Sequence, residues 1–163
     1  MTSLNRVLST AEETEALGAA LAQRRPSDAS LRVIYLTGDL GAGKTTFTRG
    51  FLRASGIAGT VRSPTYTLVE AYKVGSTTYL HLDLYRLNEP SELENLGLRD
   101  WAGPGHLWLI EWPERGAARL PPADLVVSLT AGSGTDSAHT AVIVGASATG
   151  KQWLGTLAEA GES

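Results

Sequence analysis

The residues best suited to chemistry in this chain of 163 residues form a glycine-rich stretch at positions 38–46. The stretch contains the spacing Gly-x4-Gly-Lys-Thr, follows a short apolar run at 33–36 and leads into a segment with helical character. This strand–turn–helix context is typical of the P-loop, in which glycines let the main chain approach a polyphosphate and backbone N–H groups bind it. The sequence therefore predicts a nucleotide phosphate site at a helix start, where the helix dipole favours anions. The alternative is a glycine-rich turn that merely precedes Lys-Thr.

The chemistry of the individual side chains predicts their roles in this stretch. We expect Lys44 to reach the β- and γ-phosphates and the Thr45 hydroxyl to bind Mg²⁺. The expected nucleotide contacts are Gly38, Asp39, Gly41, Ala42, Gly43, Lys44, Thr45 and Thr46. A nucleoside triphosphate with Mg²⁺ is the implied ligand.

Two acidic residues close apolar runs that are typical of buried strands. Asp83 follows the run at 79–82, and Glu111 follows the run at 107–110. Because strand ends in a P-loop sheet meet beside the nucleotide, both carboxylates are candidates for one metal and catalytic site. The alternative for Asp83 is a helix cap or surface acid, and the alternative for Glu111 is a solvated strand end.

A polar segment at 63–67, Ser-Pro-Thr-Tyr-Thr, is a candidate sensor loop. Its hydroxyls, including those of Thr65 and Thr67, are suited to contact with a γ-phosphate or a metal-bound water. A polar turn that caps a strand is the alternative. Beside the acids, we expect Trp112 to be core or pocket wall and His81 to be a packed strand residue.

The elements that must position these residues alternate between helix and strand. Capping boxes, Ser9 with Glu12 and Thr10 with Glu13, mark the start of an amphipathic helix at 10–24. Strands are expected at 31–37, 68–72, 78–83, 107–110, 124–130 and 139–145, and helices after the P-loop to Ser55, at 91–101 from a cap at Ser91 or Asn88, and at 150–160. The pattern predicts a single α/β P-loop domain over residues 1–163, with a mixed central β-sheet flanked by helices and a loose C-terminal end.

Composition narrows the function classes. Lys and Arg number 14 against 17 Asp and Glu, giving a net charge of −3, whereas a domain that binds nucleic acid unaided usually carries a basic face. The absence of cysteine excludes a disulfide framework, a thiolate metal site and a cysteine nucleophile. Neither a signal-peptide core nor a membrane-length apolar run occurs, so we expect a cytoplasmic protein.

Four motifs in series resemble those of the bacterial TsaE (YjeE) ATPases. They are the glycine-rich stretch, Ser-Pro-Thr-Tyr-Thr-Leu-Val-Glu at 63–70, His-Leu-Asp-Leu-Tyr-Arg-Leu at 81–87 and Ile-Glu-Trp at 110–112. The likeness covers residues 31–122 well and the segment after 131 only loosely. It implies ATP and Mg²⁺ as cofactors and a role in forming threonylcarbamoyladenosine at position 37 of tRNAs that read codons beginning with A. In that family the ATPase acts on the TsaD–TsaB complex and meets tRNA indirectly through it.

The resemblance also implies the roles of residues around the phosphates. It gives Lys44 and Thr45 the phosphates and Mg²⁺, and it makes Asp83 and Glu111 the acids of the metal and catalytic site. Trp112 matches a tryptophan that the family has beside this acid.

Further from the phosphates, the resemblance places Thr65 and Thr67 in a switch-like loop. On the adenine side, relatives are expected to carry an arginine near the start of the last strand, and His139 occupies that position here. Thr10, at the first helix, is a further expected contact with the nucleotide.

Two other functions fit a short P-loop protein. A small-molecule kinase needs an acceptor pocket and a lid with several arginines, and residues 85–106 offer only Arg86 and Arg99. A nucleotide-gated binding module with negligible hydrolysis would act by conformational switching alone. The acids Asp83 and Glu111 favour catalysis over such a module.

Overall fold

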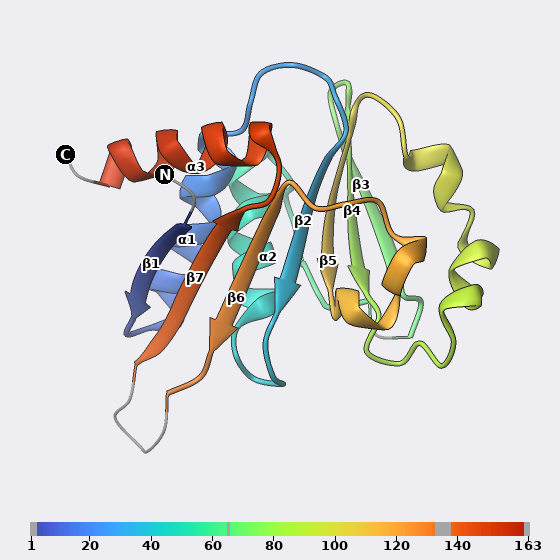
Figure 1. The fold of residues 1–163 in the computed structure, drawn as a ribbon, viewed down its shortest axis with the longest axis horizontal. Helices are drawn as coiled ribbons and strands as arrows, with labels where there is room; N and C mark the ends of the chain where they lie inside the picture. The colour runs from blue at the N-terminus through green and yellow to red at the C-terminus, as the bar shows by residue number, and fades with distance from the viewer. Residues whose placement is uncertain (1–2, 65, 133–137, 162–163) are drawn as a thin grey trace.

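The computed structural model describes residues 3–64, 66–132 and 138–161, which build one seven-stranded sheet with helices packed on it (Figure 1). Its strands are β1 (Ser3–Leu8), β2 (Arg32–Thr37), β3 (Val69–Val74), β4 (Thr77–Asp83), β5 (His106–Glu111), β6 (Leu125–Thr130) and β7 (His139–Gly145). Its α-helices are α1 (Ala11–Gln23), α2 (Lys44–Ala54) and α3 (Ala148–Gly161). Short 3₁₀ helices are η1 (Pro90–Leu96), η2 (Leu98–Trp101), η3 (Pro113–Arg115) and η4 (Ala117–Arg119). The predicted mixed α/β sheet flanked by helices is confirmed.

The strand order β1-β7-β6-β2-β5-β4-β3 places four parallel strands in the middle of the sheet. β2 pairs in parallel with β5 and β6, and β5 pairs in parallel with β4. Antiparallel strands complete both sides, with β3 on β4 and with β7 and then β1 beyond β6. Parallel strands end at the same edge of a sheet, and ligands of open α/β sheets bind at that edge. The ends of β2, β4 and β5 therefore meet beside the start of α2.

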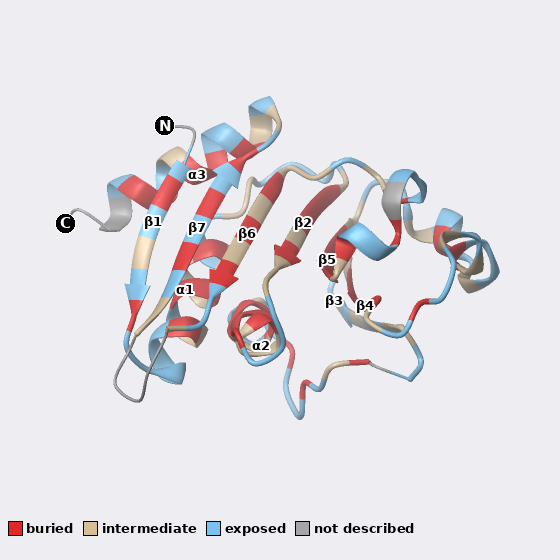
Figure 2. Ribbon diagram, turned by 60° about the horizontal axis from the view of Figure 1, so that its bottom comes forward, coloured by how far each residue is buried: buried red, intermediate tan, exposed pale blue. Residues whose placement is uncertain are grey.

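The two faces of the sheet are covered differently. In Figure 1, α1 and α2 lie behind the strands, and the apolar residues beneath them include Phe47, Phe51 and Leu109. The 3₁₀ segments cover the other face over β4 and β5, where Leu82 and Trp108 are buried. Figure 2 shows the resulting alternation of buried and exposed positions along β1 and β7. Side chains alternate between the two faces along a strand, so each side chain of β4 and β5 lies either on the face of the α-helices or on the face of the 3₁₀ segments.

Most of the expected elements are confirmed, including the helix at 10–24, the helix that follows the P-loop and the strands at 68–72 and 78–83. These two strands are β3 and β4, which pair in antiparallel fashion. The first helix begins at Thr10, whose Oγ1 accepts the Glu13 N–H at 3.1 Å, and Glu13 in turn accepts the N–H of Ser9 at 2.7 Å. The box predicted from Ser9 and Glu12 does not set the helix start, because the backbone becomes helical one residue later.

One strand was not expected, and one expectation is wrong. The unexpected strand is β1, which pairs along its whole length with β7 and buries Leu4 and Leu8. The helical region after residue 88 consists of 3₁₀ turns and is capped by Glu89 rather than by Ser91 or Asn88. Glu89 replaces them because its side chain and that of Glu92 bond each other's backbone N–H groups. Among the described residues, no helix combines the length and apolarity needed to cross a membrane.

Candidate nucleotide and metal site

The glycine-rich stretch forms a tight loop between β2 and α2. Gly38, Gly41 and Gly43 all have positive φ, at 142°, 81° and 105°. At Gly38 a Cβ atom would lie 2.3 Å from the backbone oxygen of Leu129, so the loop also needs glycine there for close packing. Gly43 is the N-cap of α2 in the left-handed conformation, which turns the chain into the helix. The predicted strand–turn–helix arrangement is therefore present, with the N-terminus of α2 at the loop.

The side chain of Lys44 lies against this loop. Its ammonium group donates hydrogen bonds to the carbonyl oxygens of Gly38 and Asp39 and stands 4.1 Å from the centre of the Trp112 ring. Burial lowers the pKa of Lys44 below its usual value, and the nearby carboxylates of Glu111 and Asp83 oppose this effect. A buried ammonium held mostly by carbonyl dipoles is an anchor for an anionic group.

The first turn of α2 is joined directly to the end of β5. The Thr45 hydroxyl donates to the Glu111 carboxylate, with Oγ1 lying 3.1 Å from Oε2 and 3.2 Å from Oε1. Glu111 is buried, on the same layer as Leu109 two residues earlier, and thus faces α2. The strand period places this acid beneath the helix rather than in solvent, so the solvated-end alternative fails.

Asp83 lies next to Glu111, because the two residues are register partners at the ends of β4 and β5. The Asp83 carboxylate is buried and accepts hydrogen bonds from the Ser63 hydroxyl and, at 3.0 Å, from the backbone N–H of Tyr85. The bond from Ser63 attaches the candidate sensor loop to this acid. The two strand-end acids converge, as the sequence predicted.

His81 is a site residue that the sequence analysis treated only as a packed strand residue. Its side chain is fully buried, and its Nε2 lies 2.6 Å from Oε2 of Glu111. Because a carboxylate accepts, Nε2 donates in this pair. Nδ1 is also buried and has no hydrogen-bond partner in the described part of the chain. The spacing of two between His81 and Asp83 was a usable signal, since it places both side chains on one face of β4.

These residues line a cavity of about 440 Å³ beside the P-loop. Residues 40–46 form one wall, and Ser63, Asp83, Glu111 and Trp112 form the other. Trp112 follows Glu111 directly, has a left-handed backbone with φ of 59°, and packs at 5.0 Å from Tyr85. It is therefore pocket wall, one of the two roles expected for it.

A second cavity, of about 380 Å³, lies on the other side of the same loop. Thr10 and His139 line it together with Gly41, Gly43 and Thr46. His139 Nδ1 lies 3.2 Å from the carbonyl oxygen of Ala42, to which it donates. The residues expected on the adenine side are therefore brought to the P-loop, and their contact with a base remains a prediction.

Only part of the candidate sensor loop at 63–67 contacts the residues of the P-loop cavity. Thr67 is exposed, its hydroxyl donates to the Val69 carbonyl at 3.4 Å, and it lines a separate cavity with Arg62 and Tyr72. Thr65 lies outside the described residues. Within the described part of this loop, Ser63 rather than Thr67 contacts the acids, and sequence reasoning did not single it out.

The donor atoms at the end of β5 fit Mg²⁺. An octahedral ion with bonds of about 2.1 Å holds neighbouring oxygens about 3.0 Å apart. The separation of 3.1 Å between Thr45 Oγ1 and Glu111 Oε2 is close to that spacing. Mg²⁺ is usually bound by one or two carboxylates together with substrate phosphates and waters rather than by a protein cage.

Comparisons with known proteins find a matching family model and several similar chains. The family model described as threonylcarbamoyl adenosine biosynthesis protein TsaE matches residues 8–139. A Haemophilus influenzae protein named tRNA threonylcarbamoyladenosine biosynthesis protein TsaE is 53% identical over 97 residues, which cover 60% of this chain and 61% of that relative. A Bacillus subtilis protein of the same name is 39% identical over 117 residues, covering 71% of this chain and 70% of its own length. The crystal structure of Bacillus subtilis YdiB is 28% identical, with a TM-score of 0.78 over 98% of this chain and 97% of that one.

Proposed function

Since the chain belongs to the TsaE family of threonylcarbamoyl adenosine biosynthesis proteins, we propose that it is a Mg²⁺-dependent ATPase of tRNA modification. It would act in the cytoplasm on the TsaD–TsaB complex during formation of threonylcarbamoyladenosine at position 37 of tRNAs that read codons beginning with A. The observation that carries the proposal is the convergence of Lys44, Thr45, Asp83 and Glu111 on one cavity beside the P-loop.

The loop geometry supports ATP as the nucleotide. Three glycines with positive φ allow successive backbone N–H groups to face a polyphosphate at the start of α2. Lys44 is tethered to two carbonyls of the same loop, so rotation of its flexible side chain is enough to exchange a carbonyl for a phosphate oxygen. The charge-assisted bond to phosphate is the stronger of the two.

Asp83 and Glu111 are the residues proposed to bind the metal and to position the attacking water. Thr45, Asp83 and Glu111 would hold Mg²⁺, whose charge would offset that of the β- and γ-phosphates. Glu111 is fixed by two donors, the Thr45 hydroxyl and the His81 ring, and is therefore aimed before the nucleotide arrives. Asp83 is fixed by Ser63 and the Tyr85 N–H. Together the two carboxylates would bind the metal and orient the attacking water.

Exposed side chains beside the site support the binding of a partner protein that responds to the bound nucleotide. Leu40 in the P-loop is 65% exposed and Tyr66 in the sensor loop is 85% exposed, both large for apolar or aromatic side chains. The Arg86 guanidinium stacks 4.9 Å from the centre of the Tyr66 ring. A partner docked here would cover the cavity mouth, and a chain with a net charge of −3 would leave most tRNA contact to that partner.

The test is a reconstituted reaction with TsaD, TsaB, their substrates and tRNA, in which both product tRNA and released phosphate are followed over many turnovers. Lys44→Ala should abolish both signals. Lys73→Ala, which removes an exposed lysine from β3, is the matched control and should leave both unchanged. Full product formation by Lys44→Ala would refute the proposal.

The same assay separates the other two functions. A phosphorylated metabolite formed in place of free phosphate, across a panel of nucleosides and sugars, would identify a kinase. Product formation that needs ATP but survives Asp83→Ala and Glu111→Ala with full turnover would refute the site assignment.

A further inference from the structure

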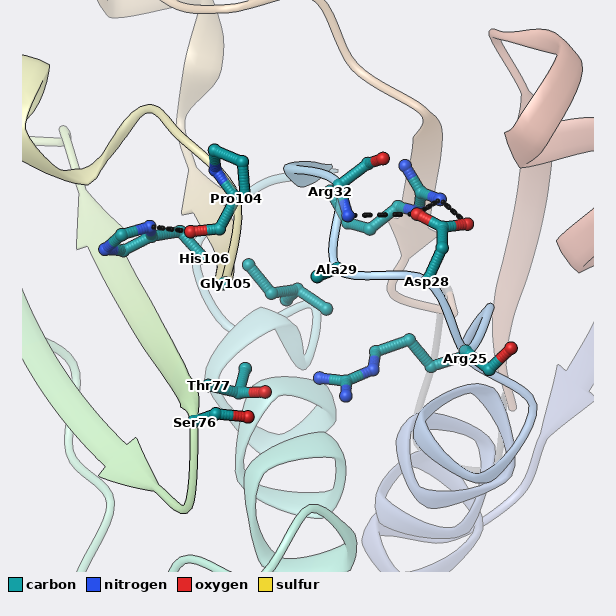
Figure 3. Close-up of a pocket in the computed structure, with 12 residues that line it drawn as sticks. Arg25, Asp28, Ala29, Arg32, Ser76, Thr77, Pro104, Gly105 and His106 are labelled. Atoms are coloured by element: carbon teal, nitrogen blue, oxygen red, sulfur yellow. Dashed lines mark hydrogen bonds and ion pairs between the residues drawn. The ribbon is translucent and has the colours of Figure 1, made fainter.

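A fourth cavity, of about 360 Å³, lies where β2, β4 and β5 begin, at the end of the sheet opposite the P-loop. Figure 3 shows the residues that line it. Its walls come from the start of β2 at Arg32, the start of β5 at His106, and Ser76 and Thr77, where β4 begins. These parallel strands begin at this cavity and end at the nucleotide site. Its size falls in the range of small-molecule sites, about 300–1,000 Å³.

The walls of this cavity are tied together by backbone hydrogen bonds. The Gly105 N–H donates to the Ala29 carbonyl at 2.7 Å, and the Thr78 N–H donates to the Gly105 carbonyl at 2.8 Å. These two hydrogen bonds join the loop after α1, the loop before β5 and the first residues of β4. A site whose walls are fixed before binding loses little conformational freedom when a ligand enters.

Arg25, just after α1, extends its side chain into the cavity towards Thr77 (Figure 3). One guanidinium nitrogen donates to the Tyr79 hydroxyl at 2.7 Å, and the group lies 5.6 Å from the centre of the Tyr79 ring. Tyr79 is itself buried, so it holds the guanidinium in place. Within the described ranges, Arg25 has no carboxylate within ion-pair distance. Most of its donors are left for another acceptor.

The other charges of the cavity offset each other. The Arg32 guanidinium binds both carboxylate oxygens of Asp28, at 2.6 and 2.7 Å. A hydrogen bond from the Ser30 N–H, with a smaller contribution from Arg32, holds the pKa of Asp28 below its usual value, so this carboxylate stays charged and paired. His106 Nδ1 faces two carbonyl oxygens, those of Gly103 and Pro104, so Nδ1 carries a proton. The positive charge of Arg25 is therefore the one that remains uncompensated.

We propose that this cavity binds the phosphoryl group of a small molecule. Arg25 is the charged anchor, and the hydroxyls of Ser76 and Thr77 are the neutral donors beside it. Guanidinium and hydroxyl donors together are the usual means by which proteins hold phosphate. This cavity shares no lining residue with the P-loop site, so phosphoryl binding here does not require ATP hydrolysis.

The proposal is tested by titrating the ¹⁵N-labelled protein with inorganic phosphate and following backbone amide shifts residue by residue. Saturable shifts are expected at Ser76, Thr77 and Gly105, separately from any shifts in the P-loop. Arg25→Gln should weaken the affinity at the cavity about tenfold or more, as loss of a charge-assisted bond predicts. Arg53→Gln is the matched control, because it removes the same charge from an exposed arginine on α2 and should change nothing at the cavity.

A second variant protects the test against misfolding of Arg25→Gln, because Arg25 also braces Tyr79. Thr77→Val keeps the side-chain shape and should weaken phosphate binding roughly two- to tenfold. Arg25→Lys should restore part of the affinity that Arg25→Gln loses. A parallel titration with acetate at the same ionic strength should give weaker shifts than phosphate.

Three results would each overturn the proposal. They are the absence of saturable phosphate shifts at the cavity, equal affinity in folded Arg25→Gln and in the unaltered chain, and acetate binding that is tighter than phosphate binding. The last result would assign the cavity to carboxylates instead.

Discussion

The buried pair of His81 and Glu111 gives the sharpest prediction. Replacing His81 by Leu removes the donor 2.6 Å from Oε2 and leaves a buried carboxylate with the Thr45 hydroxyl as its remaining donor among the described side chains. Removing the donor from a buried, hydrogen-bonded carboxylate costs about 1–3 kcal/mol or more, because a charged acceptor is left unsatisfied. We expect His81→Leu to lower the free energy of unfolding by an amount in this range.

A double-mutant cycle isolates the interaction itself. Glu111→Leu removes the acceptor and leaves a buried imidazole N–H, at a cost of about 1–3 kcal/mol. The double variant lacks both groups, so its loss should be smaller than the sum of the single losses by about 1.5–3 kcal/mol, the usual contribution of a charge-assisted hydrogen bond. A purely packing role for His81 predicts additivity.

Urea unfolding monitored by tryptophan fluorescence measures all four free energies, and an unchanged m-value shows that the variants share one folded state. His106→Leu combined with Glu111→Leu is the control cycle, since His106 lies at the far end of β5 from Glu111. That pair should be additive within about 0.5 kcal/mol. A coupling energy of His81 with Glu111 no larger than the control would refute the positioning of Glu111 by His81.

The remaining predictions concern packing, the metal and pH. Gly50→Ala should lower the free energy of unfolding by about 1–3 kcal/mol, because the added Cβ would lie 2.0 Å from a backbone oxygen of α1. Gly155→Ala adds a Cβ in open space on α3 and should raise the free energy of unfolding by about 0.5–1 kcal/mol. Urea unfolding measures both changes. Thr45→Val should raise the Mg²⁺ concentration needed for fluorescent ATP-analogue binding about tenfold or more, while Thr48→Val, which alters a buried hydroxyl that has no partner among described residues, should not. Asp28→Asn should lower the melting temperature at neutral pH. The pKa of Asp28 in the folded chain is below the ordinary value of 3.8, so its charged form stabilises the fold above pH 3.8. The difference in melting temperature between the variant and the unaltered chain should vanish as the pH falls through the folded pKa.

Much of the site was predictable because it depends on local patterns. The P-loop spacing, the apolar runs that end at Asp83 and Glu111, and the sheet rule that gathers strand ends together place these acids beside Thr45. None of these steps requires knowledge of which strands are neighbours beyond the parallel core. The face on which Glu111 lies was not predictable in this way, because all four residues at 107–110 are apolar.

The features that the sequence analysis missed depend on contacts between distant segments. β1 carries only two buried positions, Leu4 and Leu8, and becomes a strand because the edge of β7 is available to pair with it. The bond from Ser63 to Asp83 arises from the path of a loop that no periodicity describes. His81 was placed correctly in a strand, but its contact with Glu111 depends on the pairing of β4 with β5.

The pairing of β1 with β7 has a consequence for protein synthesis. The cavity of about 380 Å³ beside the P-loop is lined by Thr10, which follows β1, and by His139, which begins β7. Leu8 of β1 is the register partner of His139. A ribosome therefore produces the P-loop, both acids and their helix long before it produces the strand that completes this cavity. Contacts so far apart in sequence form late in folding. If the nucleotide binds as proposed, its full affinity would be reached only after β7 has left the ribosome and paired with β1.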